Sequence, residues 1–155
     1  MQTFASEIKS PFTGGRVKEV IKDEVQIFRK EKYVVKSHYY VCEETNEEFT
    51  TTEQDTKTFE DLYSQYRKRH GIPTPQEIKD IRLSYGLNYT QITKILGFGT
   101  NQYKQYEDGQ VPSESNGKLI QTIKDKSNML NLLTLSKEKF SEEEFERIKE
   151  GIGKV

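Results

Sequence analysis

Cysteine is almost absent from this chain of 155 residues: Cys42 is the single cysteine, and there is no tryptophan. One cysteine excludes an internal disulfide and cannot complete a cysteine zinc site. No apolar run approaches the length of a membrane span and no signal peptide opens the chain, so we expect a cytoplasmic protein without membrane contacts. No nucleophile–base or metal-ligand pattern appears, so we expect neither an enzyme nor a bound metal or other cofactor.

An excess of either charge is also missing. The net charge is −1, and charged and hydrophobic residues each make up 32% of the chain. This balance argues against strong nonspecific binding to nucleic acid. One compact basic cluster, Arg67-Lys68-Arg69, ends a predicted helix, where it either complements the helix dipole or contacts phosphate. The length suits one domain or two small ones.

Two predicted helices in the middle of the chain carry the same start signal. Thr74 is followed three residues later by Glu77, and Asn88 by Gln91, and both pairs fit a capping box. Each helix is followed by a glycine that suits a left-handed end, and these are Gly86 and Gly97.

A short turn, Gly97-Phe98-Gly99, leads into a third predicted helix, as two crossing helices require. We expect Thr100 to cap this helix and Tyr103 and Tyr106 to face inward. The outward residues are Asn101, Gln102, Lys104 and Gln105. Amides pair with adenine, and lysine suits guanine or phosphate, so the pattern predicts a helix that reads base edges in double-stranded DNA. The alternative is a protein-interaction adaptor whose polar helix face does not read DNA.

The stretch from Leu87 to Gly109 resembles the helix-turn-helix of the Cro/repressor (XRE) family. The matching motifs are L-x-x-x-x-I-x-x-I-L-G and T-N-x-Y-x-Q-Y. The resemblance implies an all-α, lambda-repressor-like domain. Those proteins usually carry glutamine at the first turn of the second helix, where it contacts the DNA backbone. Tyr89 stands there in this chain, and we expect its hydroxyl to donate to a phosphate.

The region before Phe49 is rich in strand-forming residues. Residues 16–28 alternate between apolar and polar, and residues 32–42 are dense in tyrosine and valine. With Lys22-Asp23 and Arg29-Lys30-Glu31 as candidate turns, we expect an antiparallel sheet of two or three strands. A helix from Thr52 to His70 follows, so the predicted fold class is α+β.

Two short motifs in this region have the spacing of zinc knuckles. Ser10-Pro11-Phe12-Thr13 stands where a C-P-x-C motif would lie, and Cys42-Glu43-Glu44-Thr45 where a second C-x-x-C would lie. The predicted sheet is therefore zinc-ribbon-like without zinc. We expect Cys42 to be a buried small apolar residue, and Phe12, Phe49 and nearby tyrosines to supply contacts in place of the metal.

The order of ribbon-like region, helix and helix-turn-helix resembles the MqsA/YgiT-type antitoxins of type II toxin–antitoxin systems, from about Ser10 to Leu133. This resemblance implies an N-terminal domain that binds a cognate toxin and a C-terminal domain that dimerises on an operator. It also implies that Asn101 reads a base, whereas Gln105 replaces an arginine and should change the base preference. The predicted function is a sequence-specific transcriptional repressor, an antitoxin that represses its own operon.

We divide the chain into a ribbon-like domain with its helix (1–71), a helix-turn-helix domain (72–136) and a C-terminal helix or tail (137–155). A further helix is expected from Lys118 to Lys126. The apolar run from Met129 to Leu135 either fills the core or forms a homodimer interface. The last helix, capped at Ser141, either docks on the domain or begins a further segment.

Overall fold

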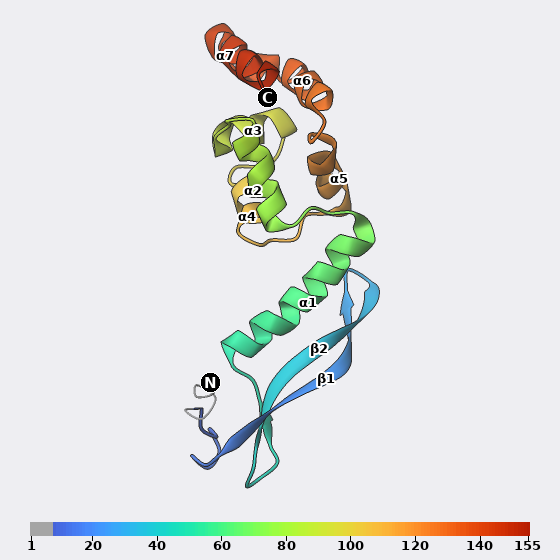
Figure 1. The fold of residues 1–155 in the computed structure, drawn as a ribbon, viewed down its shortest axis with the longest axis vertical. Coiled ribbons are helices and arrows are strands. Elements are labelled where there is room, and N and C mark those ends of the chain that lie inside the picture. The colour runs from blue at the N-terminus through green and yellow to red at the C-terminus, as the bar shows by residue number, and fades with distance from the viewer. Residues whose placement is uncertain (1–7) are drawn as a thin grey trace. The chain divides into compact units, whose positions relative to one another are not determined.

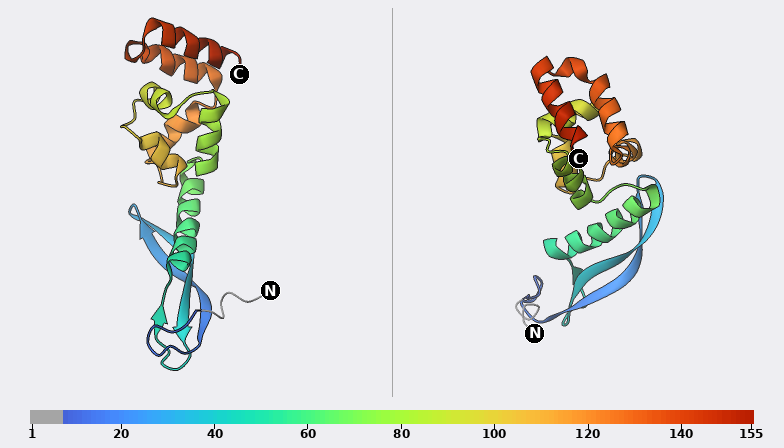
Figure 2. Two further views of the ribbon diagram at one scale, coloured as in Figure 1. Left: turned by 90° about the vertical axis from the view of Figure 1, so that its left-hand side faces the viewer. Right: turned by 45° about the horizontal axis from the view of Figure 1, so that its top comes forward.

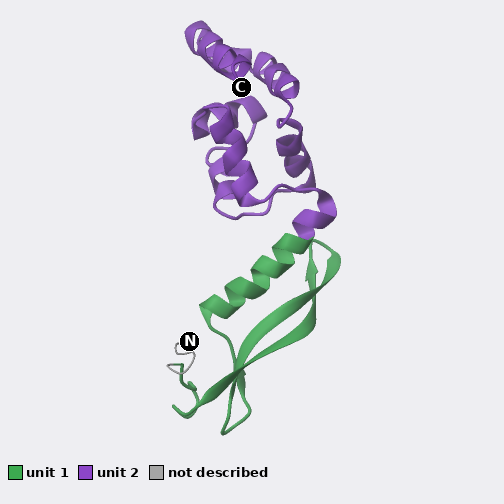
Figure 3. Ribbon diagram, viewed as in Figure 1, with its two compact units in different colours: residues 1–65 green, residues 66–155 purple. Residues whose placement is uncertain are grey.

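The computed structural model describes residues 8–155, which form a three-stranded antiparallel sheet followed by seven α-helices (Figure 1). The mixed α+β class is therefore confirmed. Two compact units, Met1–Gln65 and Tyr66–Val155, divide the chain inside α1 (Thr52–His70) (Figure 3). Over residues 8–155, none of the helices combines the length and the apolar character that crossing a membrane would need.

The sheet of the first unit is built on one long hairpin. Strand β1 (Val17–Phe28) pairs over its whole length with β2 (Glu31–Cys42), and β2 pairs briefly with β3 (Glu48–Phe49). The two-residue turn between β1 and β2 has positive φ at Arg29 (49°) and Lys30 (68°). Two such residues in a row are typical of the turns that suit the twist of a tight hairpin.

The predicted turn at Lys22-Asp23 is wrong. Both residues lie inside β1, opposite Ser37 and Lys36. Asp23 accepts a hydrogen bond from Lys36 Nζ at 2.6 Å, so the charges form a cross-strand pair. Charged residues on an exposed strand gave the same sequence signal as a turn.

Helix α1 covers the edge of β2 that does not pair with β1. Its side chains, spaced about one helical turn apart, bind the outward backbone groups of alternate β2 residues. The N–H of His38 donates to Thr58 Oγ1 (3.2 Å), the N–H of Lys36 donates to Asp61 Oδ2 (2.7 Å), and Gln65 Nε2 donates to the carbonyl of Val34 (2.8 Å). An edge satisfied in this way is closed to further strand pairing.

Two six-residue loops of the first unit, residues 10–15 and 42–47, share one backbone pattern. In each, the N–H of the fifth residue donates to the carbonyl of the first at 2.8 Å, and the N–H of the first donates to the carbonyl of the sixth at 2.9 Å. The fifth residues, Gly14 and Asn46, have positive φ values of 75° and 62°. The fourth residues, Thr13 and Thr45, accept from the N–H of the sixth at 3.1 and 3.3 Å. The loops are a structural repeat that the sequence showed only as two motifs.

Cys42 is fully buried where these loops meet, as predicted, but it is not the purely apolar residue expected, because three hydroxyls bond to its thiol. Its thiol lies 3.6 Å from Thr13 Oγ1. Hydrogen bonds from the hydroxyls of Ser10, Thr45 and Thr13 lower the pKa of Cys42 to about 6, although burial opposes this. One thiol and three hydroxyls do not fit Zn²⁺, which takes thiolate, imidazole or carboxylate ligands. Beside the loops, Phe12 and Tyr40 pack on Phe49 with centroids 6.1 and 5.5 Å apart, which confirms the expected aromatic contacts.

The second unit is entirely helical apart from its turns. Its elements are α2 (Pro75–Ser84), α3 (Tyr89–Leu96), α4 (Gln102–Glu107), α5 (Glu114–Thr122), α6 (Lys126–Leu135), a short 3-10 helix η2 (Lys137–Lys139) and α7 (Glu142–Gly153). Both predicted capping boxes, at Thr74 and Asn88, are confirmed. The glycines after α2 and within the α3–α4 turn, Gly86 and Gly97, have the predicted left-handed backbone.

The predicted helix from Lys118 to Lys126 is wrong at both ends. The chain instead forms α5, capped by Ser113, and α6, capped by Asp125. Ser113 accepts from the N–H of Asn116 at 3.2 Å, and Asp125 from the N–H of Ser127 at 2.8 Å. Both residues are strong helix starts that the apolar spacing alone did not reveal.

One continuous core holds the second unit together. Helices α6 and α7 contact each other and lie side by side in the left view of Figure 2. Met129 and Leu133 of α6 are fully buried, whereas Leu135 is 83% exposed, so much of the apolar run fills the core. Residues of α7 join the same cluster as α2, α3 and α4, and they are Phe145, Ile148 and Ile152. Residues 137–155 thus belong to the second unit.

Candidate nucleic-acid interface

Helix α4 is fixed from behind by its two tyrosines, as the sequence predicted. Tyr103 is fully buried and donates to the carbonyl of Ile78, and this burial raises its pKa. Tyr106 accepts from Asn116 Nδ2 at 2.8 Å. Phe98, in the turn before α4, packs against both rings with centroids 6.5 and 5.7 Å away. The helix has only six residues, so these contacts rather than its length determine its position.

A buried ion pair joins α2 to the end of α4. Arg82 donates through Nε and Nη2 to the two carboxylate oxygens of Glu107, at 2.7 and 3.2 Å, and through Nη1 to the carbonyl of Leu87 at 3.1 Å. The two side chains are 11% and 3% exposed. Glu107 raises the pKa of Arg82 above its already high value. Sequence reasoning missed this pair, although an arginine on an apolar helix face implies a buried acidic partner.

Tyr89 belongs to the same arrangement. Its hydroxyl donates to Glu107 Oε1 at 2.9 Å, and the guanidinium of Arg82 lies 4.1 Å from its ring centroid. The hydrogen bond to Glu107 is the main cause of a raised Tyr89 pKa. The hydroxyl expected at a phosphate therefore has an internal partner, and Tyr89 helps to position α3 against α4.

Thr100 does not cap α4, contrary to prediction. The helix begins at Gln102, and Asn101 occupies the cap position with φ 66° and no side-chain capping bond. Asparagine tolerates this left-handed backbone better than most residues, because its side chain is short and polar. The N–H of Gln105 donates to the carbonyl of Asn101 at 3.0 Å. Asn101 and Gln105 therefore remain one turn apart, and the Asn101 amide is not used to cap the helix.

A small hollow of about 170 Å³ lies between α3 and the start of α4. It brings together three predicted residues with three that the sequence did not single out. The lining residues are Tyr89, Thr90, Thr93, Lys94, Thr100 and Asn101. The three additional residues all lie on α3, at spacings that place them on one face of a helix. These three residues lie on the side of α3 opposite the buried Ile92 and Ile95, and this spacing could have identified them from the sequence.

The remaining predicted residues lie along α4. Gln102 donates to Gln110 Oε1 at 2.7 Å, and Lys104 pairs with Asp108 at 2.8 Å, which raises the pKa of Lys104. Gln105 is exposed. The exposed side of α3 and α4 therefore combines amides, hydroxyls and two lysines on a rigidly held backbone.

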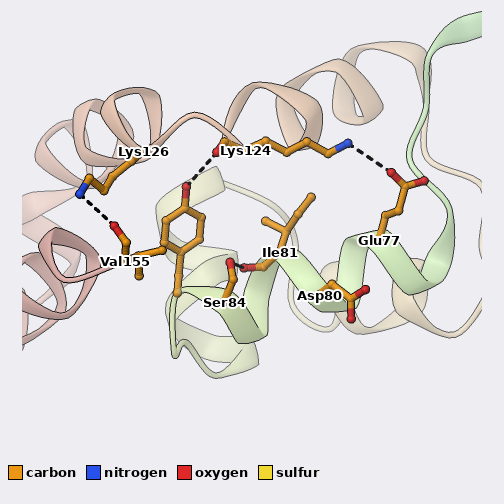
Figure 4. Close-up of a pocket in the computed structure, with 8 residues that line it drawn as sticks. Glu77, Asp80, Ile81, Ser84, Lys124, Lys126 and Val155 are labelled. Atoms are coloured by element: carbon orange, nitrogen blue, oxygen red, sulfur yellow. Dashed lines mark hydrogen bonds and ion pairs between the residues drawn. The ribbon is translucent and has the colours of Figure 1, made fainter.

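A larger hollow of about 510 Å³ lies between α2 and the link from α5 to α6 (Figure 4). Its rim mixes both charges, and Lys124 pairs with Glu77 at 3.2 Å. The N–H of Thr74 also donates to Glu77, and this bond is the main cause of the lowered Glu77 pKa. Glu77 therefore completes the capping box of α2 and pairs with Lys124 at the rim of the hollow.

Comparison with known proteins gives no match, whether to a model of a protein family, to a curated protein or to a solved structure. What the chain does must therefore be inferred from its own residues. Over residues 8–155, no three side chains of histidine, cysteine, aspartate or glutamate converge as a metal site requires.

Proposed function

We propose that the protein binds double-stranded DNA through α3, the turn after it and α4, which act as a helix-turn-helix. The observation that carries the proposal is the contrast between the two sides of α4. Its inner side is fixed by Tyr103, Tyr106 and the Arg82–Glu107 pair. Its outer side presents Asn101 and Gln105 one turn apart. A recognition helix needs this combination of a fixed backbone and free amides near its start.

The exposed amides favour A·T pairs, since asparagine and glutamine bond bidentately to adenine in the major groove. The hollow beside Asn101 adds Thr90, Thr93 and Lys94, which suit contacts to the phosphate backbone. Tyr89 is then a positioning residue, because its hydroxyl holds Glu107. Affinity depends on few cations, so sequence readout must carry a large share of it.

We further propose that this binding represses transcription of the protein's own operon, as in the MqsA/YgiT-type antitoxins. The first unit would bind a cognate toxin, and a homodimer would place two recognition helices on one operator. The support is the order of a three-stranded sheet, helix α1 and the helices α2, α3 and α4, together with the two matching loops around Cys42.

The test is binding of the full chain to DNA from upstream of its own gene, compared with scrambled DNA, at two salt concentrations. Asn101→Ala and Gln105→Ala should each cost about 1–3 kcal/mol on the specific DNA only. Lys104→Ala should weaken both DNAs more evenly and reduce the salt dependence. Gln76→Ala, which removes an exposed amide from α2, is the matched control.

The second candidate is a protein-interaction adaptor. It is favoured by the net charge of −1 and by the intramolecular bonds of Gln102 and Lys104, which occupy two of the predicted DNA contacts. If Asn101→Ala and Gln105→Ala leave the specific-to-nonspecific ratio unchanged while thermal melts show folded protein, the adaptor takes the place of the repressor.

A further inference from the structure

The two edges of the long hairpin differ. The outer edge of β2 is bound by α1 and β3, whereas β1 is the outermost strand of the sheet formed by the described residues. Even-numbered residues of β2, such as Lys36 and His38, direct their backbone groups toward α1. Because direction alternates along a strand, the odd-numbered residues of β2 bond to β1, and the odd-numbered residues of β1 then direct theirs outward.

The same odd-numbered positions of β1 carry exposed apolar side chains. Ile21, Val25 and Ile27 are 54%, 62% and 68% exposed. Val34 of β2 is 58% exposed and lies directly opposite Val25, so it belongs to the same face of the sheet. An apolar face beside an open strand edge is the usual mark of an interface.

We propose that β1 pairs in antiparallel fashion with β1 of a second copy of this chain, with Asp23 on the two-fold axis. In this register Ile21 lies opposite Val25 of the partner subunit, twice by symmetry. On the other face, Lys22 lies opposite Glu24 of the partner subunit, also twice. The two Asp23 side chains meet at the axis, each already paired with Lys36 of its own chain at 2.6 Å.

Charge selects this register over its neighbours. Alternation of the pleat allows only registers in which odd residues face odd residues. Registers centred on Lys22, Asp23 or Glu24 all oppose two like charges at the axis, which is destabilising. Asp23 differs because Lys36 of its own chain already neutralises it, and only its register places Lys22 opposite Glu24. The Asp23 register instead forms two ion pairs and two apolar pairs. It also joins two three-stranded sheets into one and satisfies the outward backbone groups.

Charge exchange at these positions tests the proposal with the full chain. Sedimentation equilibrium should show a dimer whose dissociation constant rises about tenfold with Lys22→Glu or with Glu24→Lys, because each change replaces two attractive pairs by two repulsive ones. The double variant should recover the wild-type constant. An equimolar mixture of the two single variants should recover it as well, since every mixed pair again joins an acidic and a basic side chain.

Lys18→Glu is the matched control, because it makes the same change of charge opposite an uncharged residue, Phe28 of the partner subunit. It should leave the dissociation constant unchanged. Circular dichroism confirms that each variant is folded, and recovery in the mixture shows this independently. A wild-type chain that remains monomeric overturns the proposal, and the edge of β1 would then be a candidate binding site for a different protein. A dimer whose dissociation constant is the same in all these variants also overturns the proposal. Self-association would then involve another surface, for example one on the second unit.

Discussion

The two units are stabilised by different means. In the second unit, residues from α2 to α7 form one cluster of buried apolar side chains. In the first unit the buried apolar residues are fewer, and they include Tyr33, Val35 and Leu62. Polar contacts therefore contribute a larger share of its stability. These contacts are the two matching loops around Cys42 and the side chains of α1 that bind the edge of β2.

The first unit therefore depends on polar contacts to a greater extent than the second, which has a large apolar core. Small units bury too little apolar surface to be stable by that means alone. Hydrogen bonds add only about 0.5–1.5 kcal/mol each, but leaving a buried polar group without a partner costs more. The first unit should therefore respond strongly to changes in its polar clusters, and the second unit to the loss of its core or its buried ion pair.

Building a metal site into the first unit should change its stability most strongly. The triple variant Ser10→Cys, Thr13→Cys and Thr45→Cys places four thiols around the two loops. Tetrahedral Zn²⁺ with Zn–S bonds of about 2.3 Å needs sulfur atoms about 3.8 Å apart, close to the 3.6 Å between Thr13 Oγ1 and Cys42 Sγ. We expect one Zn²⁺ per chain and a gain of several kcal/mol in the stability of the first unit, since structural zinc contributes about 10–16 kcal/mol in zinc fingers.

The measurement is metal content by mass spectrometry together with urea unfolding in zinc and in chelator. The wild-type chain is the control and should show no zinc-dependent shift. A triple variant that folds but takes up no zinc would mean that the four side chains do not converge as the two loops suggest.

Breaking the buried ion pair tests the second unit. Glu107→Ala leaves the guanidinium of Arg82 without its carboxylate, and we expect a loss of about 3–5 kcal/mol in the free energy of unfolding. Asp108→Ala, the adjacent control, removes an exposed pair with Lys104 and should cost less than about 1 kcal/mol. Equal losses for the two variants in urea titrations would show that the buried pair has no special role.

Local signals in the sequence predicted much of the second unit. The capping boxes at Thr74 and Asn88 and the inward tyrosines of α4 are set by neighbouring residues, which the sequence displays directly. The Arg82–Glu107 pair was missed because the two residues are distant in sequence and only tertiary packing brings them together. The start of α4 was misplaced because Thr100 and Asn101 are both good caps and the backbone uses the second position without its side chain.

In the first unit the pattern of strands was clear but their limits were not. Charged residues such as Lys22 and Asp23 interrupt an apolar pattern equally well in a turn and in an exposed strand. The matching loops were visible as motifs at Ser10 and Cys42, but their shared hydrogen bonds depend on backbone geometry at Gly14 and Asn46. In the candidate site, the polarity of the α4 residues was enough to predict them from the sequence. Thr90, Thr93 and Lys94 of α3 became candidates only because the structure shows that they line the hollow beside Asn101.

A smaller effect concerns Tyr89. Tyr89→Phe removes the hydrogen bond to Glu107 but leaves the bonds from Arg82, so we expect a loss of about 0.5–1.5 kcal/mol in stability. DNA affinity measured by fluorescence anisotropy should fall much less than in Asn101→Ala, because the hydroxyl contacts Glu107 rather than DNA and Arg82 still holds Glu107. Normal stability with weaker binding to every DNA sequence would instead assign the hydroxyl to a phosphate, as the sequence suggested.

The last prediction concerns Cys42 and the dependence of the first unit on pH. Folding lowers the pKa of the thiol from about 8.5, its ordinary value, to about 6. A lowered pKa stabilises the folded state fully above the pKa of the unfolded thiol, and this contribution is lost as the pH falls through the folded value. In reducing buffer, the stability of the wild-type chain relative to Cys42→Ser should therefore increase from pH 6 to pH 9, in urea titrations that follow the sheet.

Thiolate absorbance gives the same quantity without unfolding the protein. Its midpoint should lie near 6 in the wild-type chain, and it should rise in Ser10→Ala and in Thr45→Ala, because each variant removes a hydroxyl that donates to the thiolate. Thr50→Ala, which removes the hydroxyl that donates to Asp55, is the matched control and should leave the midpoint in place. A midpoint at the ordinary value of a free cysteine would show that the hydroxyls pack around a neutral thiol. The loops would then depend on their backbone hydrogen bonds alone.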